Sequence, residues 1–322
     1  MKISRRVLVT GALGQIGSEL TTALCERYGY DNVVATDVKE DAGIFGGRVA
    51  FELLDVLKPE QIDATLAKHR VDTVYHLAAV LSAIAEMAPL KAWHINMDGL
   101  FYVLEAARTH RCAVFFPSSI GAFGPTTPLD NTPQDTIQRP NTMYGVSKVA
   151  GELLCDYFFK RYGVDTRGVR FPGIISNVTP PGGGTTDYAV TIFYEAIKRK
   201  RYTCILRGDT SLDMMYMPDA IKAAIMVMEA DPARLRHRNS FNVTAMHFTP
   251  EVLAAEIRKH IPDFVMDYKV DEMRQAIADS WPNWMDDGAA REEWDWRPDY
   301  DLPRMTADMI AVLKKRHETV AL

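Results

Sequence analysis

The sequence lacks the features that mark several large classes of protein. It has no uninterrupted apolar stretch of about 18 residues, so we expect no membrane-spanning helix. Its net charge is only −5, which gives it little attraction for nucleic acid or for a membrane surface. No internal repeat or low-complexity tract interrupts the 322 residues. With 47% hydrophobic and 25% charged residues, the composition is typical of a globular protein with a large core.

Cysteine and histidine are sparse and scattered. The eight histidines lie apart, and no pair of cysteines or histidines has the spacing of metal ligands, so we expect no metal site. Scattered cysteines are typical of reduced thiols in a cytoplasmic protein. A first strand within the first ten residues also predicts that no signal or transit peptide is present. The cysteines are Cys25, Cys112, Cys155 and Cys204.

Glycine is concentrated where the chain first turns. Residues 7–17 read VLVTGALGQIG, in which an apolar run predicts a buried strand and the residues after the turn show the apolar spacing of a helix. Glycines let a backbone approach a pyrophosphate closely, and a helix N-terminus offers N–H groups and a positive dipole. We therefore expect a dinucleotide site at this turn. Its predicted members are Gly11, Gly14, Gln15, Ile16 and Gly17.

Acidic residues follow the next two predicted strands. The strand at 32–36 ends at Asp37, about 20 positions after the glycines, where a carboxylate commonly binds the ribose hydroxyls of adenosine. Its charge would repel a 2′-phosphate, so NAD is favoured over NADP. The strand predicted at 51–56 carries Asp55 and Val56, which we expect near the adenine.

Two further strands complete an alternating pattern. They are predicted at 73–79 and 113–116, and residues 89–110 between them have the periodicity of a helix. Strands that alternate with helices predict an α/β fold of the Rossmann type, a doubly wound parallel sheet with right-handed crossovers. Ligands bind at the carboxyl ends of such strands. The residues expected there beside a nicotinamide ribose are Leu77, Ala78 and Ala79.

The segment YGVSK contains the most informative pair of the chain. Tyr144 and Lys148 are four residues apart, so on a helix they lie on one face, and an ammonium beside a phenol favours the phenolate. A phenol whose pKa is brought close to neutrality can act as a general base. Ser119, at the end of the fifth strand, can hold the reacting oxygen. The same spacing also occurs by chance, as a solvated lysine beside a packed tyrosine, but the glycine turn favours the catalytic interpretation.

These motifs together resemble the extended type of short-chain dehydrogenase/reductase. The resemblance rests on TGALGQIG, Asp37, LDV at 54–56, HLAA at 76–79, FPSSIGAFG and YGVSK. Four further segments are similar to the short-chain type of L-threonine 3-dehydrogenase. They are RFPGIIS at 170–176, PGGGTTDYAVTIFYEAI at 181–197, DMMYMPDAI at 213–221 and the C-terminal WPNWMDDGAAREEWDWRPDYDL.

The resemblance implies a specific reaction, the oxidation of L-threonine by NAD to 2-amino-3-ketobutyrate. It implies that Tyr144 is the general base, that Lys148 binds the nicotinamide ribose and assists Tyr144, and that Ser119 polarises the substrate hydroxyl. It also implies that Asn96 and Phe171 belong to the cofactor site, and that the protein is a homodimer. Two residues depart from the family pattern: Trp284 replaces a smaller polar residue, and Asp295 replaces a glycine.

A second group of residues is expected to bind the amino acid itself. The run PPGGGTT at 180–186 offers backbone N–H groups and hydroxyls that suit a carboxylate, although an ordinary surface loop is the alternative. Ser82 follows the fourth strand, where it either contacts the substrate or caps a helix. Trp281 either covers the pocket or belongs to the core. The predicted substrate-binding residues are Ser82, Ser119, Tyr144, Gly184, Thr185, Thr186 and Trp281.

The expected organisation is discontinuous. We predict that residues 1–172 and 213–248 form the NAD-binding domain, and that residues 173–212 and 249–322 form a smaller C-terminal substrate lobe. The tryptophans at 281, 284, 294 and 296 are expected in the smaller lobe.

Two rival functions fit the same scaffold. A sugar-nucleotide epimerase or dehydratase would need a pocket with basic residues for a nucleotide diphosphate. A non-catalytic regulator that senses NAD would have no need of serine, tyrosine and lysine together, and all three are present here.

Overall fold

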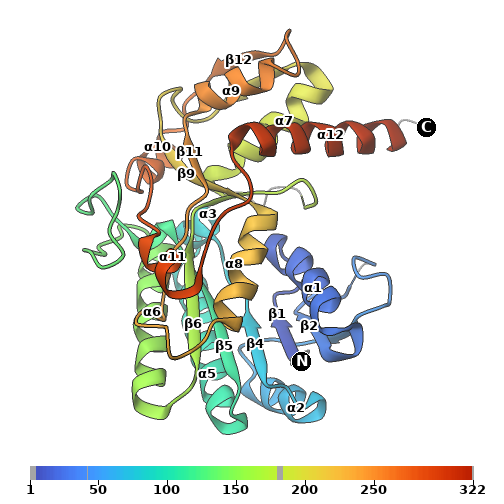
Figure 1. Ribbon diagram of the computed structural model, residues 1–322, viewed down its shortest axis with the longest axis vertical. Coiled ribbons are helices and arrows are strands. Elements are labelled where there is room, and N and C mark those ends of the chain that lie inside the picture. The colour runs from blue at the N-terminus through green and yellow to red at the C-terminus, as the bar shows by residue number, and fades with distance from the viewer. Residues whose placement is uncertain (1–4, 42, 180–183, 321–322) are drawn as a thin grey trace.

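A seven-stranded parallel sheet forms the larger part of the molecule (Figure 1). The computed structural model describes residues 5–41, 43–179 and 184–320. In sheet order the strands are β10 (Phe241–Asn242), β6 (Thr166–Phe171), β5 (Ala113–Ser119), β4 (Thr73–His76), β1 (Val7–Thr10), β2 (Val33–Asp37) and β3 (Ala50–Leu53). The predicted Rossmann-type fold is therefore confirmed.

Helices cover both faces of this sheet because its strands are apolar on both sides. Leu8 packs into one core with three helices, α2 (Pro59–His69), α5 (Gly99–His110) and α6 (Met143–Tyr162). Its neighbours Val7 and Val9 pack into a second core on the opposite face. That core holds α1 (Gln15–Tyr28), α8 (Met217–Glu229) and α11 (Gly288–Trp294).

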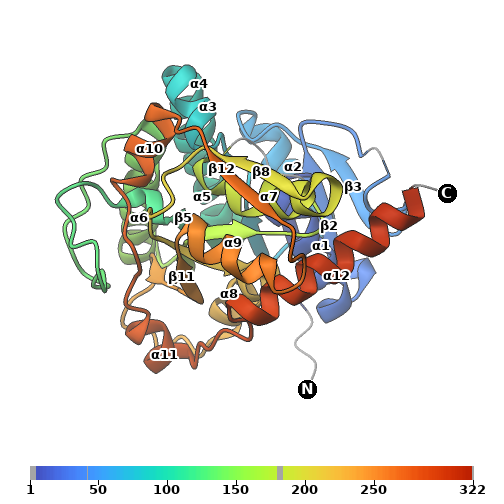
Figure 2. The ribbon, with the colours of Figure 1, turned by 90° about the horizontal axis from the view of Figure 1, so that it is seen from above.

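A smaller lobe lies above the carboxyl ends of the strands (Figures 1 and 2). It has its own apolar core, around a three-stranded sheet and a parallel pair of strands. The sheet contains β7 (Gly173–Ile175), β9 (Leu212–Tyr216) and β11 (Met246–Phe248), and the pair contains β8 (Arg201–Cys204) and β12 (Val265–Tyr268). Its helices are α7 (Tyr188–Arg199), α9 (Pro250–Arg258), α10 (Glu272–Ala278) and α12 (Leu302–Val320).

Several element boundaries differ from the predictions. β3 ends at Leu53 and β4 at His76, so the residues after them are loops at the edge of the sheet. The helix expected over 89–110 is divided by a π-helical turn, η2 (His94–Asp98), between α4 (Pro89–Trp93) and α5. Such turns are frequent at functional sites.

Two of the tryptophans lie in the other lobe from the one expected. Trp294 and Trp296 belong to the core beneath the seven-stranded sheet, where Trp294 contacts the ring of Phe241 with 5.7 Å between centroids. The C-terminal segment crosses back to the larger lobe at α11, and apolar composition alone does not reveal such a crossing. The segment 213–248 is also shared: α8 and β10 pack in the larger lobe, whereas β9 and β11 join the smaller sheet. The domain boundaries stay a prediction.

The two departures from the family pattern have simple local explanations. Trp284 stacks on the ring of His247, with 4.9 Å between the centroids. Asp295 ends α11 with φ of 61°, in the left-handed region that favours glycine. Its carboxylate also pairs with Arg234 at 2.5 Å, an exposed ion pair that contributes little to stability.

No helix within the described residues combines the length and the apolarity needed to cross a membrane.

Candidate active site

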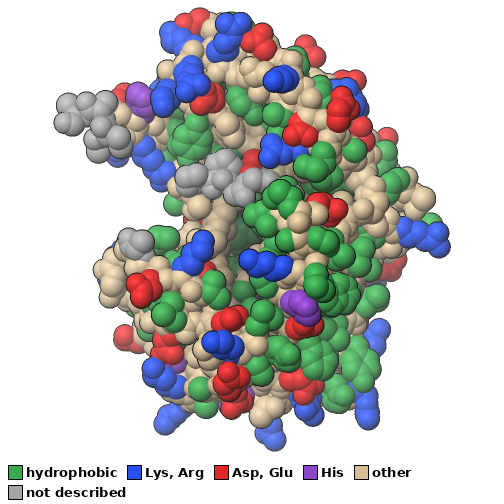
Figure 3. All heavy atoms as spheres, turned by 180° about the vertical axis from the view of Figure 1, so that it is seen from behind, with side chains coloured by type: hydrophobic (Ala, Val, Ile, Leu, Met, Phe, Trp, Pro, Cys, Tyr) green, Lys and Arg blue, Asp and Glu red, His purple; other side chains and the backbone are tan. Residues whose placement is uncertain are grey.

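A cavity of about 240 Å³ lies between the two lobes, at the carboxyl edge of the large sheet. The space-filling view in Figure 3 shows the surface indented between the lobes. The walls of the cavity include the glycine turn, the ends of β4, β5 and β6, the start of α6 and residues of the smaller lobe. The predicted site residues that line it are Gly11, Gly14, Gln15, Ile16, Gly17, Leu77, Ala79, Ser82, Ser119, Tyr144, Lys148, Phe171, Gly184, Thr185, Thr186 and Trp281.

The glycine turn is packed so closely that side chains are excluded. Gly11 has φ of +67°, and a Cβ placed on it would lie 2.7 Å from the backbone nitrogen of Ala78. A Cβ on Gly17 would lie 2.2 Å from the carbonyl oxygen of Gly11. Gly14 precedes α1 and supplies no side-chain cap, which leaves the first N–H groups of the helix open to a ligand. This open helix terminus beside a bare backbone fits a pyrophosphate.

The carboxylate that ends β2 supports this turn. Asp37 Oδ2 accepts a hydrogen bond from the backbone N–H of Leu13 at 3.1 Å. Asp55 Oδ1 accepts one from Leu57 N at 3.0 Å, and Val56 is buried against the helix at Gly99. Asp37, Asp55 and Val56 do not line the cavity, and their contacts with the adenosine stay predictions.

A second, much smaller cavity lies behind Lys148. It is lined by His76, Ala78, Ala79, Asn96, Phe116, Ser147 and Lys148. Asn96 is in the π-helical turn and joins two segments of the site: its Oδ1 accepts from Val80 N at 2.7 Å, and its Nδ2 donates to Ser147 Oγ at 3.2 Å. Asn96 therefore holds the loop after β4 against α6, and Ala78 lies beside it rather than in the main cavity.

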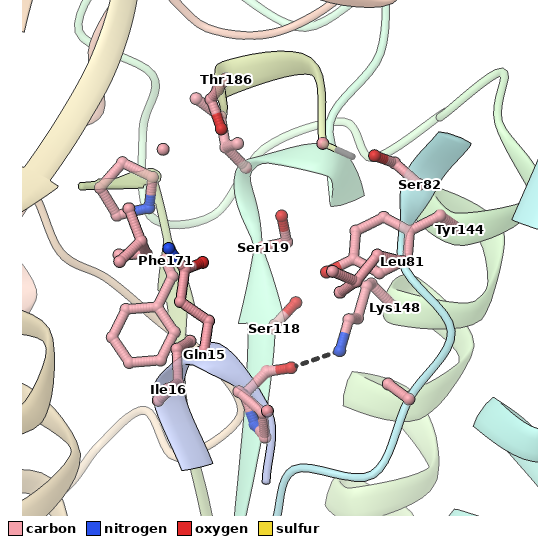
Figure 4. A pocket seen from close by; sticks show the side chains of 18 of the residues that line it. Gln15, Ile16, Leu81, Ser82, Ser118, Ser119, Tyr144, Lys148, Phe171 and Thr186 are labelled. Carbon is pink, nitrogen blue, oxygen red and sulfur yellow. Dashed lines mark hydrogen bonds between the residues drawn. The ribbon is translucent and has the colours of Figure 1, made fainter. Parts of the chain in front are cut away.

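The structure brings Ser119, Tyr144 and Lys148 together at the end of β5 (Figure 4). Thr142 begins α6 as its N-cap, accepting from Gly145 N at 3.0 Å, so that Tyr144 lies in the first turn. The Lys148 ammonium lies 5.3 Å from the centroid of the Tyr144 ring and donates to the carbonyl oxygen of Pro117 at 2.7 Å. Ser119 Oγ accepts from Gly121 N at 3.1 Å.

Burial dominates the electrostatics of these groups. It raises the pKa of Tyr144 to about 12, and a hydrogen bond with Ser119 opposes this change. Burial also lowers the pKa of Lys148 to about 8, against the attraction of Glu152. The role of Tyr144 as a base stays a prediction: burial disfavours its phenolate, and the neighbouring ammonium of Lys148 favours it.

The smaller lobe supplies the opposite wall of the cavity. Thr185 is buried, and its hydroxyl oxygen has no hydrogen-bond partner among the described residues. Trp281 lines the cavity and is also part of the apolar core of the smaller lobe, so both interpretations of this residue hold. Ser82 is the first residue of α3 (Ser82–Met87), whose N-cap position is Leu81, so Ser82 does not cap this helix. Gly184 N donates to the Asp187 carboxylate at 2.6 Å. Pro180 to Gly183 lie outside the described residues.

Several lining residues were not predicted from the sequence. They are Leu81, Pro117, Ser118, Ile120, Pro172, Gly173, Ile174 and Asp187. Each is a close sequence neighbour of a predicted residue, so the strand-end rule would have found them if it had been applied to two or three positions on either side.

Within the part of the chain that the structure describes, no group of three or more His, Cys, Asp or Glu side chains is placed to hold a metal ion.

The fold and this edge of the sheet define a protein that binds a dinucleotide beside a serine, a tyrosine and a lysine. The chain belongs to the NAD dependent epimerase/dehydratase family, whose model matches residues 7–244. NAD is accordingly its cofactor, and the resemblance to extended short-chain dehydrogenases/reductases is confirmed.

Individual relatives match almost the whole chain. An uncharacterized epimerase/dehydratase of Staphylococcus haemolyticus is 54% identical, over 97% of this chain and 99% of its own. The structure of an L-threonine dehydrogenase of Clostridium difficile is 54% identical, with a TM-score of 0.96 over 97% of this chain and 98% of that one. The holo form of a GalE-like L-threonine dehydrogenase of Cupriavidus necator is 49% identical, with a TM-score of 0.94 over 96% and 100% of the two chains.

Proposed function

We propose that this protein is an NAD-dependent L-threonine 3-dehydrogenase, which oxidises the 3-hydroxyl of L-threonine to 2-amino-3-ketobutyrate. The observation that carries the proposal is the convergence of Ser119, Tyr144 and Lys148 on one small cavity beside the glycine turn. The similarity to two solved L-threonine dehydrogenases at 49% and 54% identity supports the choice of substrate.

The three side chains have distinct roles in the proposed reaction. Tyr144 accepts the proton of the 3-hydroxyl, and Ser119 donates a hydrogen bond to the oxygen that loses it. Lys148 stabilises the phenolate with its charge. When bound, NAD supplies the ring that accepts the hydride from C3, together with a positive charge that favours the phenolate. The backbone of the glycine turn holds the pyrophosphate, and Asp37 binds the adenosine ribose.

The cavity favours a small substrate over a sugar nucleotide. Among the described residues that line it, Lys148 is the one cationic side chain, and it is already directed to Pro117 O. A second nucleotide diphosphate would find no arginine or lysine there to pair with its phosphates. A free amino acid needs only a few polar groups, such as the unpartnered hydroxyl of Thr185.

The formation of NADH tests this choice directly. The purified protein is assayed with NAD and a panel that contains L-threonine, L-allo-threonine, L-serine, UDP-galactose and UDP-glucose. We expect the fastest NADH formation with L-threonine and no conversion of either UDP-sugar. Turnover of a UDP-sugar without reduction of NAD by threonine would replace the proposal with an epimerase.

We further propose that the protein is a cytoplasmic homodimer. All four cysteines are free and buried, as expected in a reducing compartment. Large apolar side chains are exposed on α3 to α6, and Figure 3 shows apolar side chains gathered on one side of the larger lobe. The most exposed are Met87, Leu90, Leu153 and Tyr157. Sedimentation should give the mass of a dimer, and Leu153→Glu should shift it toward the monomer; a monomeric wild-type protein would contradict this proposal.

A further inference from the structure

The end of β5 is joined to α6 at two consecutive residues. Pro117 O accepts from the ammonium of Lys148 at 2.7 Å, and Ser118 Oγ donates to the carboxylate of Glu152. Because Tyr144, Lys148 and Glu152 are spaced by four residues, they lie on the same face of the helix, one turn apart. The first of these hydrogen bonds involves a proposed catalytic group, and the second involves Glu152, to which no role has been given.

The helix approaches the strand so closely because a glycine lies between the tied residues. A Cβ on Gly151 would lie 2.5 Å from the ring of Phe116, the residue that precedes the tied end of β5. With this glycine in place, a short serine side chain reaches the carboxylate of Glu152. The contact is thus a built feature of the packing between α6 and the sheet.

Glu152 is also half of a buried ion pair. Its carboxylate accepts from Arg170 Nε at 3.0 Å and from Arg170 Nη2 at 2.8 Å, while only 2% of Glu152 and 5% of Arg170 are exposed. Arg170 lies on β6, directly opposite Ser118 in the register of the two strands. Gln138 Nε2 donates to the same carboxylate at 3.0 Å. A buried carboxylate with this many donors is held in one position.

The charge of Glu152 acts on Lys148 one turn away. Among the described groups around Lys148, Tyr144, Glu152 and Cys155 lie on the same helix, and His76 approaches from β4. His76 is uncharged, since burial lowers its pKa to about 3, and Cys155 is a thiol because burial raises its pKa far above neutrality. Arg170, on β6, is a cation that pairs with the carboxylate of Glu152. Glu152 is therefore the one anion that opposes the loss of the proton from Lys148.

We propose that Glu152, held by Arg170, is a positioning residue that fixes the end of β5 on α6 and keeps Lys148 in its ammonium form. The link to catalysis rests on the proposed function, in which Lys148 stabilises the phenolate of Tyr144. The placement of the carboxylate and its effect on Lys148 do not depend on which alcohol is oxidised.

The test is a titration of Lys148 in the full-length protein with NAD added. NMR of protein labelled at the lysine side chains follows the ammonium, and the resonance missing from Lys148→Met identifies it. Removing the negative charge in Glu152→Gln destabilises the ammonium, so Lys148 should lose its proton about one pH unit lower than in the wild type. Ser118→Ala, which removes the contact but keeps the charge, should leave this midpoint in place. An unchanged midpoint in Glu152→Gln overturns the proposal.

A kinetic measurement separates positioning from simple damage to the fold. In Glu152→Gln the alkaline limb of the kcat profile with L-threonine should move to lower pH by the same amount, whereas in Ser118→Ala kcat should fall several-fold at every pH. If kcat of Glu152→Gln falls by the same factor at every pH, Glu152 has only a structural role. If Glu152→Gln does not fold because Arg170 is left unpaired, the double variant Glu152→Gln with Arg170→Gln serves in its place. A wild type inactive on threonine would refute the proposed function, while the titration still decides the role of Glu152.

Discussion

The two walls of the cavity are built in different ways. The wall from the larger lobe is made of closely packed backbone, as at Gly17, and of side chains such as Ser118, which is held by the buried carboxylate of Glu152. The wall from the smaller lobe is made of side chains such as Thr185 and Trp281, which are almost 100 residues apart in the sequence. Within the part of the chain that the structure describes, the hydroxyl of Thr185 has no hydrogen-bond partner. We propose from this difference that the wall of the larger lobe carries the chemistry and that the wall of the smaller lobe selects the substrate.

The largest effect is expected in the wall of the larger lobe, at Tyr144. Tyr144→Phe removes the base but keeps the ring, so kcat with L-threonine should fall about 1,000-fold. The affinity for NADH, measured by fluorescence titration, should stay within a few-fold of the wild type. Tyr157→Phe is the matched control, since it is on the same helix and half exposed. Near-normal turnover by Tyr144→Phe would remove this residue from the proposed mechanism.

The next effect tests how closely the glycine turn is packed. Gly17→Ala places a Cβ 2.2 Å from a carbonyl oxygen, and such overpacking costs about 1–3 kcal/mol. Its unfolding temperature should drop, and NAD should bind more weakly. In the control Gly14→Ala the same carbonyl oxygen lies 3.2 Å from the new Cβ, so the unfolding temperature should change little. Equal unfolding temperatures for the two variants would show that the turn can relax.

A smaller effect is expected at Asp37, which supports the turn through Leu13 N. Asp37→Ala removes both this hydrogen bond and the predicted ribose contact, so the Kd for NAD should rise about tenfold, equivalent to about 1.4 kcal/mol. Asp37→Asn keeps an acceptor but loses the charge that repels a 2′-phosphate. Its preference for NAD over NADP should therefore weaken. Calorimetric Kd values that match the wild type in both variants would contradict the ribose contact.

The smallest effect is expected in the wall of the smaller lobe, at Thr185. Thr185→Val should raise the KM for L-threonine several-fold and leave the KM for NAD unchanged. It should also raise the unfolding temperature slightly, because an unpartnered buried hydroxyl costs about 1–3 kcal/mol. Thr306 in α12 is a matched control, a buried threonine with an unpartnered hydroxyl outside the cavity. Thr306→Val should raise the unfolding temperature without a change in KM. If the KM of Thr185→Val for L-threonine does not rise, the hydroxyl takes no part in substrate binding.

The same difference between the walls explains what could be predicted from the sequence. The glycine turn and Tyr144 with Lys148 depend on contacts a few residues apart, and the rule that ligands bind at strand ends then placed Ser119. The pairing of Glu152 with Arg170 joins a helix to a strand 18 residues later, and nothing in the spacing indicates it. The spacing of four from Lys148 was the one available signal.

The crossing of the chain between the lobes was harder to predict. Trp281 and Trp294 are only 13 residues apart and equally apolar, yet they lie in different cores. Hydrophobicity indicates that a side chain is buried but not which core receives it. The effect of burial on the pKa of Tyr144 could not be predicted either, because the spacing shows the neighbouring charge but not the degree of burial.

The most direct test of the central claim follows the hydrogen on C3 of the substrate. L-threonine deuterated at C3 is incubated with the protein and NAD, and the reduced cofactor is examined by NMR. If Tyr144 removes the hydroxyl proton while C3 gives up its hydride, the deuterium should appear at C4 of the reduced nicotinamide. Reduced cofactor without deuterium, or no reduction at all, would contradict the account.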